Sequence, residues 1–193
     1  MSLYNKKGIY PLLWLRRIRH SRGFGVQSPT AYSFIRYVIN EHYPYYAYSE
    51  LAEQFPSTGW CERKLFRLYL RIANHVQAAV MVDLCGRNDC LRAYVKAGCH
   101  STEVVYAMPD NGTAGIVRMR ITDGFPTQFS NVIDKVDAQS IVVIEDIHRN
   151  REARKMWRNV VADKRTGRTF DLYYCGIVTF DLSKYKQHYK VNF

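Results

Sequence analysis

The feature that most constrains the fold is a regular alternation of strand-like and helix-like segments between residues 78 and 147. Short runs rich in Val and Ile are typical of strands, and segments with helical spacing such as 91–98 and 127–136 lie between them. The strand candidates are 78–85, 102–108, 116–123 and 140–147. This order predicts an α/β fold, a mostly parallel sheet with helices on both faces.

The C-terminal third predicts a change of strand direction. Residues 151–163 have the pattern of a helix, and residues 169–182 contain two strand-like runs separated by little more than Cys175-Gly176. So short a link allows only an antiparallel hairpin or one long bent strand. Within the sheet, residues 116–123 alternate apolar and basic side chains, so we expect that strand to be less buried or near an edge.

The first part of the chain predicts helices, which we interpret as a helical N-terminal extension (1–76) of an α/β domain (77–193) in one compact unit. A first helix carries Leu12, Leu13, Leu15 and Ile18 on one side, opposite several arginines. Ser28-Pro29 is a typical start of a second helix, and residues 61–76 form an amphipathic third. Residues 43–51 form an aromatic connector.

Composition narrows the class of protein. A hydrophobic content of 47% with 14% aromatic residues is typical of a folded domain. The five cysteines are an odd set without a C-x-x-C pair, which favours a reducing cytoplasm over a disulfide framework. No apolar run approaches the roughly 20 residues that a membrane-spanning helix needs, and no signal-peptide cleavage pattern follows the first apolar segment. We therefore expect a cytoplasmic protein without a transmembrane segment.

The net charge of +11 is concentrated at the two ends of the chain. Residues 1–40 hold seven Lys/Arg and no acid, and residues 149–193 hold eleven Lys/Arg against four acids. The middle of the chain is mildly acidic. Such ends are compatible with an anionic partner, whether nucleic acid, anionic lipid or an anionic substrate, and equally with a solvated basic surface.

Several stretches carry a family resemblance. They are GFGVQSP (23–29), the YYAY connector (45–48), EDIH (145–148), the hairpin DLYYCGIVTF (171–180) and the closing KQHYKVNF (186–193). With the order of elements, they resemble the class I S-adenosylmethionine-dependent methyltransferases, and more narrowly a group of small methyltransferase-like proteins common in the Bacteroidetes. The resemblance implies a Rossmann-like methyltransferase fold whose mostly parallel sheet ends in an antiparallel hairpin strand.

The resemblance also assigns cofactor-binding positions, where this chain departs from the family. Asp83 matches the acid that ends the first strand, and Gly86 is the glycine left in a loop that carries Cys85 and Asp89 instead of further glycines. Side chains there would crowd the cofactor. The family's ribose-binding carboxylate, at the end of the second strand, is replaced by Met108, with Asp110 two residues on. The expected cofactor-binding residues are therefore Asp83, Gly86 and Asp110.

The middle of the domain is shortened. Only residues 109–115 separate the second strand candidate from the next, where a full family member has a helix, a strand and another helix. Since seven residues are too few for an ordinary parallel crossover, we expect the pairing of these strands to change, or one of them not to be a parallel strand.

Candidate catalytic residues are Asp123, Asp146 and His148, which follow predicted strand ends, where open α/β sheets bind ligands. Such carboxylates resemble the divalent-metal site of catechol-type O-methyltransferases. The competing interpretation is that Asp146 caps the next helix, Asp123 caps a turn and His148 is an ordinary polar residue. No metal site is assigned, because the spacing of Cys90, Cys99 and His100 fits no zinc pattern.

Two surface interpretations are weaker. The tyrosines of 43–48, with nearby arginines, are compatible with stacking on nucleic-acid bases, although aromatic packing over a sheet is commoner. The basic segment 11–22 is compatible with an anionic membrane surface, although we expect its apolar side to pack on its own domain.

The sequence thus predicts a methyltransferase-like protein with a degenerate cofactor pocket and a binding or scaffolding role. The first alternative is an active S-adenosylmethionine-dependent O-methyltransferase acting on a small hydroxyl-bearing substrate. The second is a nucleic-acid-binding module. S-adenosylmethionine is the cofactor if the protein is active, and otherwise no cofactor is expected.

Overall fold

The computed structural model describes residues 10–20, 23–41 and 43–193, which build an α/β fold around a seven-stranded sheet. The order across the sheet is β2-β1-β3-β4-β6-β5-β7. The strands are β1 (Val80–Asp83), β2 (Glu103–Val105), β3 (Ile116–Arg120), β4 (Ile141–Glu145), β5 (Thr169–Asp171), β6 (Cys175–Thr179) and β7 (His188–Lys190). β1 to β4 are parallel, β6 is antiparallel to both of its neighbours, and β7 is parallel to β5.

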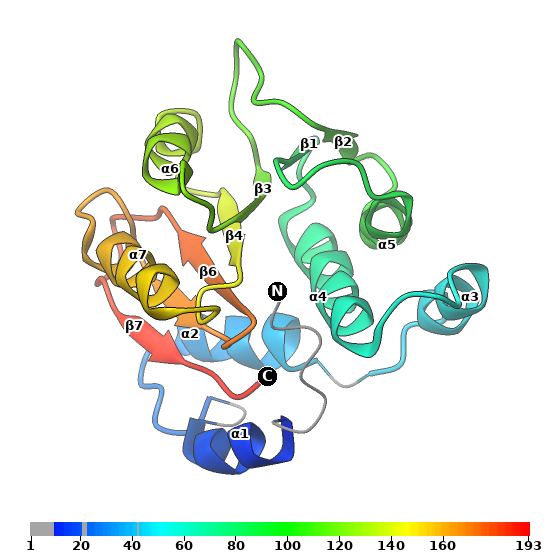
Figure 1. Cartoon of the computed structure of the whole chain (residues 1–193), viewed down its shortest axis with the longest axis horizontal. Coiled ribbons are helices and arrows are strands. Elements are labelled where there is room, and N and C mark those ends of the chain that lie inside the picture. Colours follow the sequence, from blue (N-terminus) through cyan, green and yellow to red (C-terminus); the bar gives the residue numbers. More distant parts are fainter. Residues whose placement is uncertain (1–9, 21–22, 42) are drawn as a thin grey trace.

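Helices cover both faces of this sheet (Figure 1). They are α1 (Tyr10–Arg17), α2 (Pro29–Phe34), α3 (Ala47–Gln54), α4 (Trp60–Val76), α5 (Asp89–Gly98), α6 (Phe125–Ile133) and α7 (Arg151–Ala162), with a 3-10 turn, η3 (Ile18–His20), and a π-helical turn, η4 (Ile35–Ile39). α2, η4, α4 and α5 share one hydrophobic core with one face of the sheet, and α6 and α7 share a second core with the other. This three-layer arrangement is compatible with a Rossmann-like fold.

The main predictions about the elements are confirmed. All four strand candidates between 78 and 147 are strands, and residues 169–182 form the antiparallel hairpin β5–β6. The side-chain oxygen of Ser28 accepts a hydrogen bond from the backbone N–H of Ala31, so Ser28 caps α2 and Pro29 opens it. The aromatic connector is only partly irregular, because its second half is the helix α3.

The expectation that the strand with alternating basic residues lies near an edge is wrong. β3 lies between β1 and β4, and its residues are buried up to the last, Arg120. The arginines do not need solvent because carboxylates of the two neighbouring strands pair with them. Because its arginines are paired with carboxylates, this segment can be a central strand. The alternation of residue types alone does not reveal that pairing.

The expected consequence of the shortened middle is corrected as well. β2 and β3 are both parallel strands, one on each side of β1, and they do not pair with one another. The strands are shorter than the sequence patterns suggest, which leaves residues 106–115 for the connection. This loop returns over β1 without a helix and projects beyond the sheet (Figure 1).

The described apolar side chains of α1 and η3 are more exposed than expected. Leu12, Trp14, Leu15 and Ile18 expose between 47% and 65% of their surface. The helix is instead held by polar contacts, since Arg17 pairs with Asp171 and the backbone oxygen of Trp14 accepts a hydrogen bond from Asn192. Among the described residues, no helix has both the length and the apolar character needed to cross a membrane.

Candidate functional site

The carboxyl ends of the parallel strands carry charged side chains on one face of the sheet. On the face that α4 covers, β1 and β4 place apolar residues such as Met81 and Val143 in the core. Two residues further along, β1 ends in Asp83 and β4 ends in Glu145. Arg118 lies directly opposite Asp83 in the pairing of β3 with β1. Because side chains alternate between faces, these charges project toward α4 and away from α6 and α7.

Arg118 connects the two acids in a buried network. Its Nη1 lies 3.1 Å from Oδ2 of Asp83, and its Nε lies 2.8 Å from Oε1 of Glu145. Glu145 also accepts hydrogen bonds from Arg120 Nη2 at 2.9 Å and from the hydroxyl of Tyr69 on α4 at 3.2 Å. Arg120 Nε lies 3.4 Å from Oδ2 of Asp146. Asp83 and Glu145 expose 1% of their surface.

Burial and pairing shift the pKa values of these groups in opposite directions. Burial raises the pKa of Asp83, and the charge of Arg118 offsets this only in part. Burial also acts to raise the pKa of Glu145, but the charges and hydrogen bonds of Arg118 and Arg120 outweigh it and lower that pKa. Glu145 is therefore the firmly ionised acid of the network. Removing one partner of such a buried ion pair leaves an uncompensated charge, which strongly destabilises the fold.

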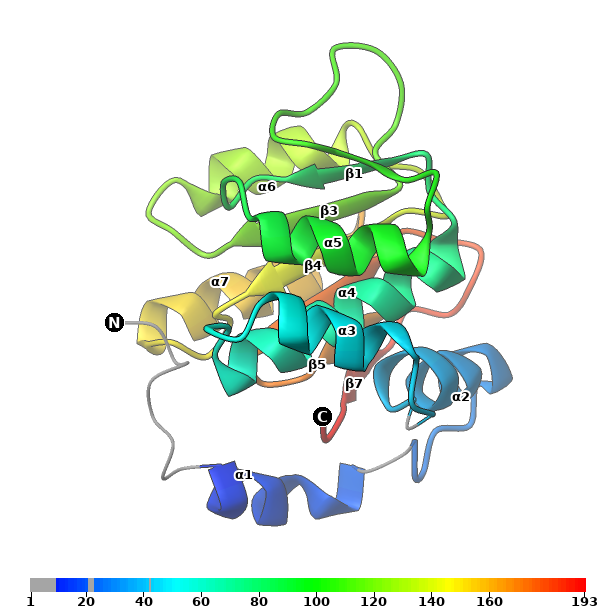
Figure 2. The same ribbon diagram turned by 90° about the vertical axis from the view of Figure 1, so that its right-hand side faces the viewer.

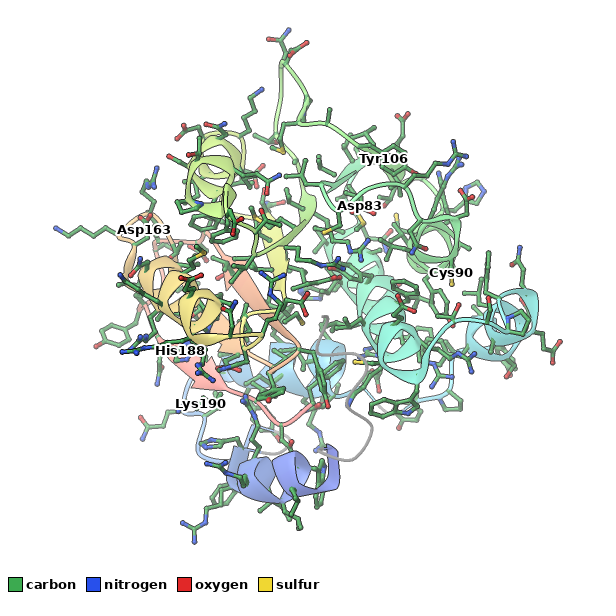
Figure 3. The ribbon with its side chains drawn as sticks, in the orientation of Figure 1. Asp83, Cys90, Tyr106, Asp163, His188 and Lys190 are labelled. Carbon is green, nitrogen blue, oxygen red and sulfur yellow. The ribbon has the colours of Figure 1, made fainter. Side chains whose placement is uncertain are left out.

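Asp83 is labelled in Figure 3, and the loop that follows it does not give its carboxylate an open approach. The backbone N–H of Cys85 donates to Oδ1 of Asp83 at 2.9 Å, so Arg118 and Cys85 together occupy both carboxylate oxygens. Arg87 and Asp89, by contrast, form an exposed ion pair on the surface. Gly86 has a φ of +99°, and nothing lies within 4 Å of the position that a Cβ would take. The loop thus blocks access to the carboxylate of Asp83 but leaves free space beside Gly86.

Two of the sequence-derived site residues lie apart from this network. Asp110 is exposed on the loop 106–115, beyond the end of β2. Asp123 is exposed on the turn before α6. Met108, at the position expected for the ribose-binding acid, is half-buried and packs against the core of α6 and α7.

Asp146 and His148 belong to two different sets of contacts. The expectation that Asp146 caps the next helix is wrong, because Asn150 accepts the hydrogen bond of Ala153 at the start of α7. Asp146 is 2% exposed, has a left-handed φ of +63° and pairs with Arg120. His148 Nε2 lies 2.8 Å from Oδ2 of Asp171.

Asp171 is the centre of a second cluster, which sequence reasoning did not identify. Arg17 of α1 pairs with its Oδ1 at 3.1 Å, and the ring of His148 stacks on Tyr173 with 5.0 Å between centroids. Burial acts to raise the pKa of Asp171, but the hydrogen bond of His148 and the charge of Arg17 lower it to about 2. Arg17 therefore points inward and is not part of a basic outer face.

A wide groove lies elsewhere, between α1, the connector after η4 and α4. Its volume is about 890 Å³. Four basic residues of α4 and several aromatic residues line it, and Glu41 is the acid on its wall. The lining residues used below are Trp14, Asn40, Tyr43, Tyr48, Trp60, Arg63, Lys64, Arg67, Arg71 and Phe193. Sequence reasoning considered the tyrosines and the terminal arginines but missed the basic side of α4.

All five cysteines are free; Cys90 lies in the first turn of α5 and Cys99 follows its last residue. Among the residues that the structure describes, no group of three or more His, Cys, Asp or Glu side chains is placed to hold a metal ion. A search against protein-family models and a search of curated proteins found no match for this chain.

Proposed function

We propose that this chain is a methyltransferase-like protein that does not bind S-adenosylmethionine and that acts as a binding protein for an anionic partner. One observation carries the first half of the proposal: Arg118 occupies the carboxylate of Asp83, the acid that ends the first strand. The methyltransferase part rests on the sequence resemblance and on the order of the strands.

The residues present do not fit the cofactor. S-adenosylmethionine carries a positive sulfonium and a positive amino group, which need carboxylate or carbonyl acceptors. Asp83 exposes 1% of its surface, and the guanidinium of Arg118 lies where a cation would have to approach. Binding would require breaking the Asp83–Arg118 pair, which leaves a buried charge uncompensated. Neither Met108 nor the exposed Asp110 replaces the missing ribose acceptor.

The binding role rests on charge. The chain has a net charge of +11, and the large groove has Arg63, Lys64 and Arg67 on one wall. A basic, concave surface raises the local concentration of anions and speeds their association.

Thermal unfolding with and without millimolar S-adenosylmethionine and S-adenosylhomocysteine tests the proposal. A ligand at 100 times its dissociation constant stabilises a fold by about 2.7 kcal/mol, a shift of roughly 5–11 °C for a domain of this size. The proposal predicts no shift with either compound. A shift with both, lost in Asp83→Asn, would overturn it.

That second result would favour the alternative, an active O-methyltransferase acting on a small hydroxyl-bearing substrate. One feature supports this alternative: Gly86 keeps a left-handed φ with free space beside it, as a loop that approaches a cofactor closely requires. In that case Asp123, Asp146 and His148 would be the residues to test for orienting the substrate.

A further inference from the structure

The groove beside α4 combines basic and aromatic side chains in one concave surface. Trp60, Arg63, Lys64, Arg67 and Arg71 recur at the three- and four-residue spacing that places side chains on one side of a helix. Trp14 of α1 and Tyr43 of the connector also line the groove, and both are more than half exposed. The C-terminal end of the chain lies between α1 and α4 in both ribbon views (Figure 1, Figure 2).

The basic side chains of this groove differ in the hydrogen bonds that they already make within the protein. Arg71 is structural, because it donates to the backbone oxygens of Val38 and Ile39 at 2.6 and 2.9 Å and to the hydroxyl of Tyr48 at 3.0 Å. Arg63 donates once, to the backbone oxygen of Thr58 at 3.2 Å. Within the described part of the chain, Arg63, Lys64 and Arg67 form no ion pair with a carboxylate.

Among the residues that the structure describes, three buried donors of groove-lining residues have no hydrogen-bond partner. They are Nε of Arg63, Nε of Arg67 and Nδ2 of Asn40. These atoms are themselves covered, so the charges of the groups that line the groove, Arg63, Lys64 and Arg67, indicate the ligand. Guanidinium and ammonium groups without a carboxylate partner favour a ligand with several acceptor oxygens, of which phosphate is the clearest example.

The aromatic residues indicate the second part of the ligand. The ammonium of Lys64 lies 4.5 Å from the ring centroid of Phe193, 5.2 Å from that of Trp60 and 5.5 Å from that of Tyr174. Burial lowers the pKa of Lys64 to about 8. The guanidinium of Arg67 lies 4.7 Å from the ring of Tyr48. A planar aromatic ligand stacks on exposed aromatic rings and on the flat guanidinium groups of arginines.

We propose that this groove binds a small planar aromatic phosphate, of the class of nucleoside monophosphates, with its phosphate on Arg63 and Arg67 and its ring on Tyr43 and Trp60. The inference deepens the proposed binding role and rests on it. The volume of about 890 Å³ is in the range typical of small-molecule sites. Single-stranded nucleic acid is less favoured, since it needs a basic track that continues beyond one groove.

Isothermal titration calorimetry with guanosine 5′-monophosphate, guanosine and inorganic phosphate at low salt tests the proposal. The monophosphate should bind at least tenfold more tightly than either of its parts. Arg67→Gln should weaken its binding at least tenfold, as expected for the loss of a charged hydrogen bond. Tyr43→Leu should weaken it severalfold, and because Tyr43 is 78% exposed the variant should fold normally.

Arg154→Gln is the matched control, because Arg154 is an exposed arginine of α7, on the other face of the sheet. It removes the same charge and should change the affinity less than twofold. Equal weakening by Arg154→Gln and Arg67→Gln, or a monophosphate no tighter than phosphate, would overturn the proposal. So would a thymidine oligonucleotide that displaces the monophosphate at lower concentration.

This test is independent of the cofactor question. Asp83 does not line the groove, so binding of the monophosphate to the natural chain is measured separately from binding of S-adenosylmethionine. If S-adenosylmethionine binds and Asp83→Asn abolishes that binding, the first half of the proposed function, the loss of cofactor binding, fails while the groove assignment stands. If Arg67→Gln has no effect, the groove assignment fails while the closed cofactor site stands.

Discussion

Arg118 of β3 lies directly opposite Asp83 of β1, with 3.1 Å between its Nη1 and Oδ2 of the acid. The same guanidinium reaches Glu145 on β4, so one side chain joins three parallel strands at their carboxyl ends. In open α/β sheets this edge is where ligands bind. Here the edge is occupied by the protein's own charges.

Removing that guanidinium should destabilise the fold strongly. Arg118→Met leaves Asp83 and part of Glu145 buried without a cation, so we expect a loss of about 3–5 kcal/mol in the free energy of unfolding, measured in urea. Arg87→Met removes an arginine of the exposed pair with Asp89 and should cost less than about 0.5 kcal/mol. Similar losses in both variants would contradict the role given to Arg118.

The cluster around Asp171 should make the free energy of unfolding depend on pH in the acidic range. The folded-state pKa of Asp171 is about 2, below the usual 3.8. Its contribution is therefore complete above pH 3.8 and is lost as the pH falls from about 3.8 toward 2. The difference corresponds to about 2 kcal/mol. Asp171→Asn should lose about that amount at pH 7 and little at pH 2, in urea unfolding. A loss that stays equal at both pH values would refute this explanation.

Because α4 and α5 are in tight contact, replacing a glycine of α5 by alanine should destabilise the fold, although alanine normally favours a helix. A Cβ on Gly98 would lie 2.1 Å from the backbone oxygen of Leu70, which cannot move without shifting α4. Gly98→Ala should therefore destabilise by about 1–3 kcal/mol, although alanine favours helices. Gly124→Ala is the control, because its Cβ meets nothing within 4 Å. Its thermal midpoint should stay close to that of the natural chain.

Binding in the groove should depend on pH through Lys64, whose pKa is about 8. The groups that face its ammonium are Cys61 and Arg71 of α4, Cys175 of β6, and the rings of Trp60, Tyr174 and Phe193. As pH rises through 8 the lysine loses its charge, so affinity for guanosine 5′-monophosphate should fall between pH 7 and 9. Lys64→Met should remove this dependence. A dependence that persists in Lys64→Met would assign it to another group.

The sequence predicted the scaffold well because its signals are local. The strand candidates, the hairpin at Cys175-Gly176 and the Ser28 cap each depend on a short pattern, and each is present in the structure. The closing strand β7 was not predicted, because a run of only three residues is too short for its alternation to stand out from the surrounding polar sequence.

The site was harder to predict because it depends on residues far apart in the chain. Arg118 meets Asp83 across 35 positions and Glu145 across 27. The available signal was complementary charge: a strand with two alternating arginines between strands that end in acids. The groove was missed for another reason, since α4 has an ordinary amphipathic pattern. Only the placement of α1 and the connector makes its basic side the wall of a groove.

Direct titration of the chain with S-adenosylhomocysteine, followed by calorimetry, tests the central claim. The Asp83–Arg118 pair predicts no saturable heat at millimolar ligand. Saturable one-to-one binding that disappears in Asp83→Asn would contradict the closed site and identify the edge of the sheet as a working cofactor pocket.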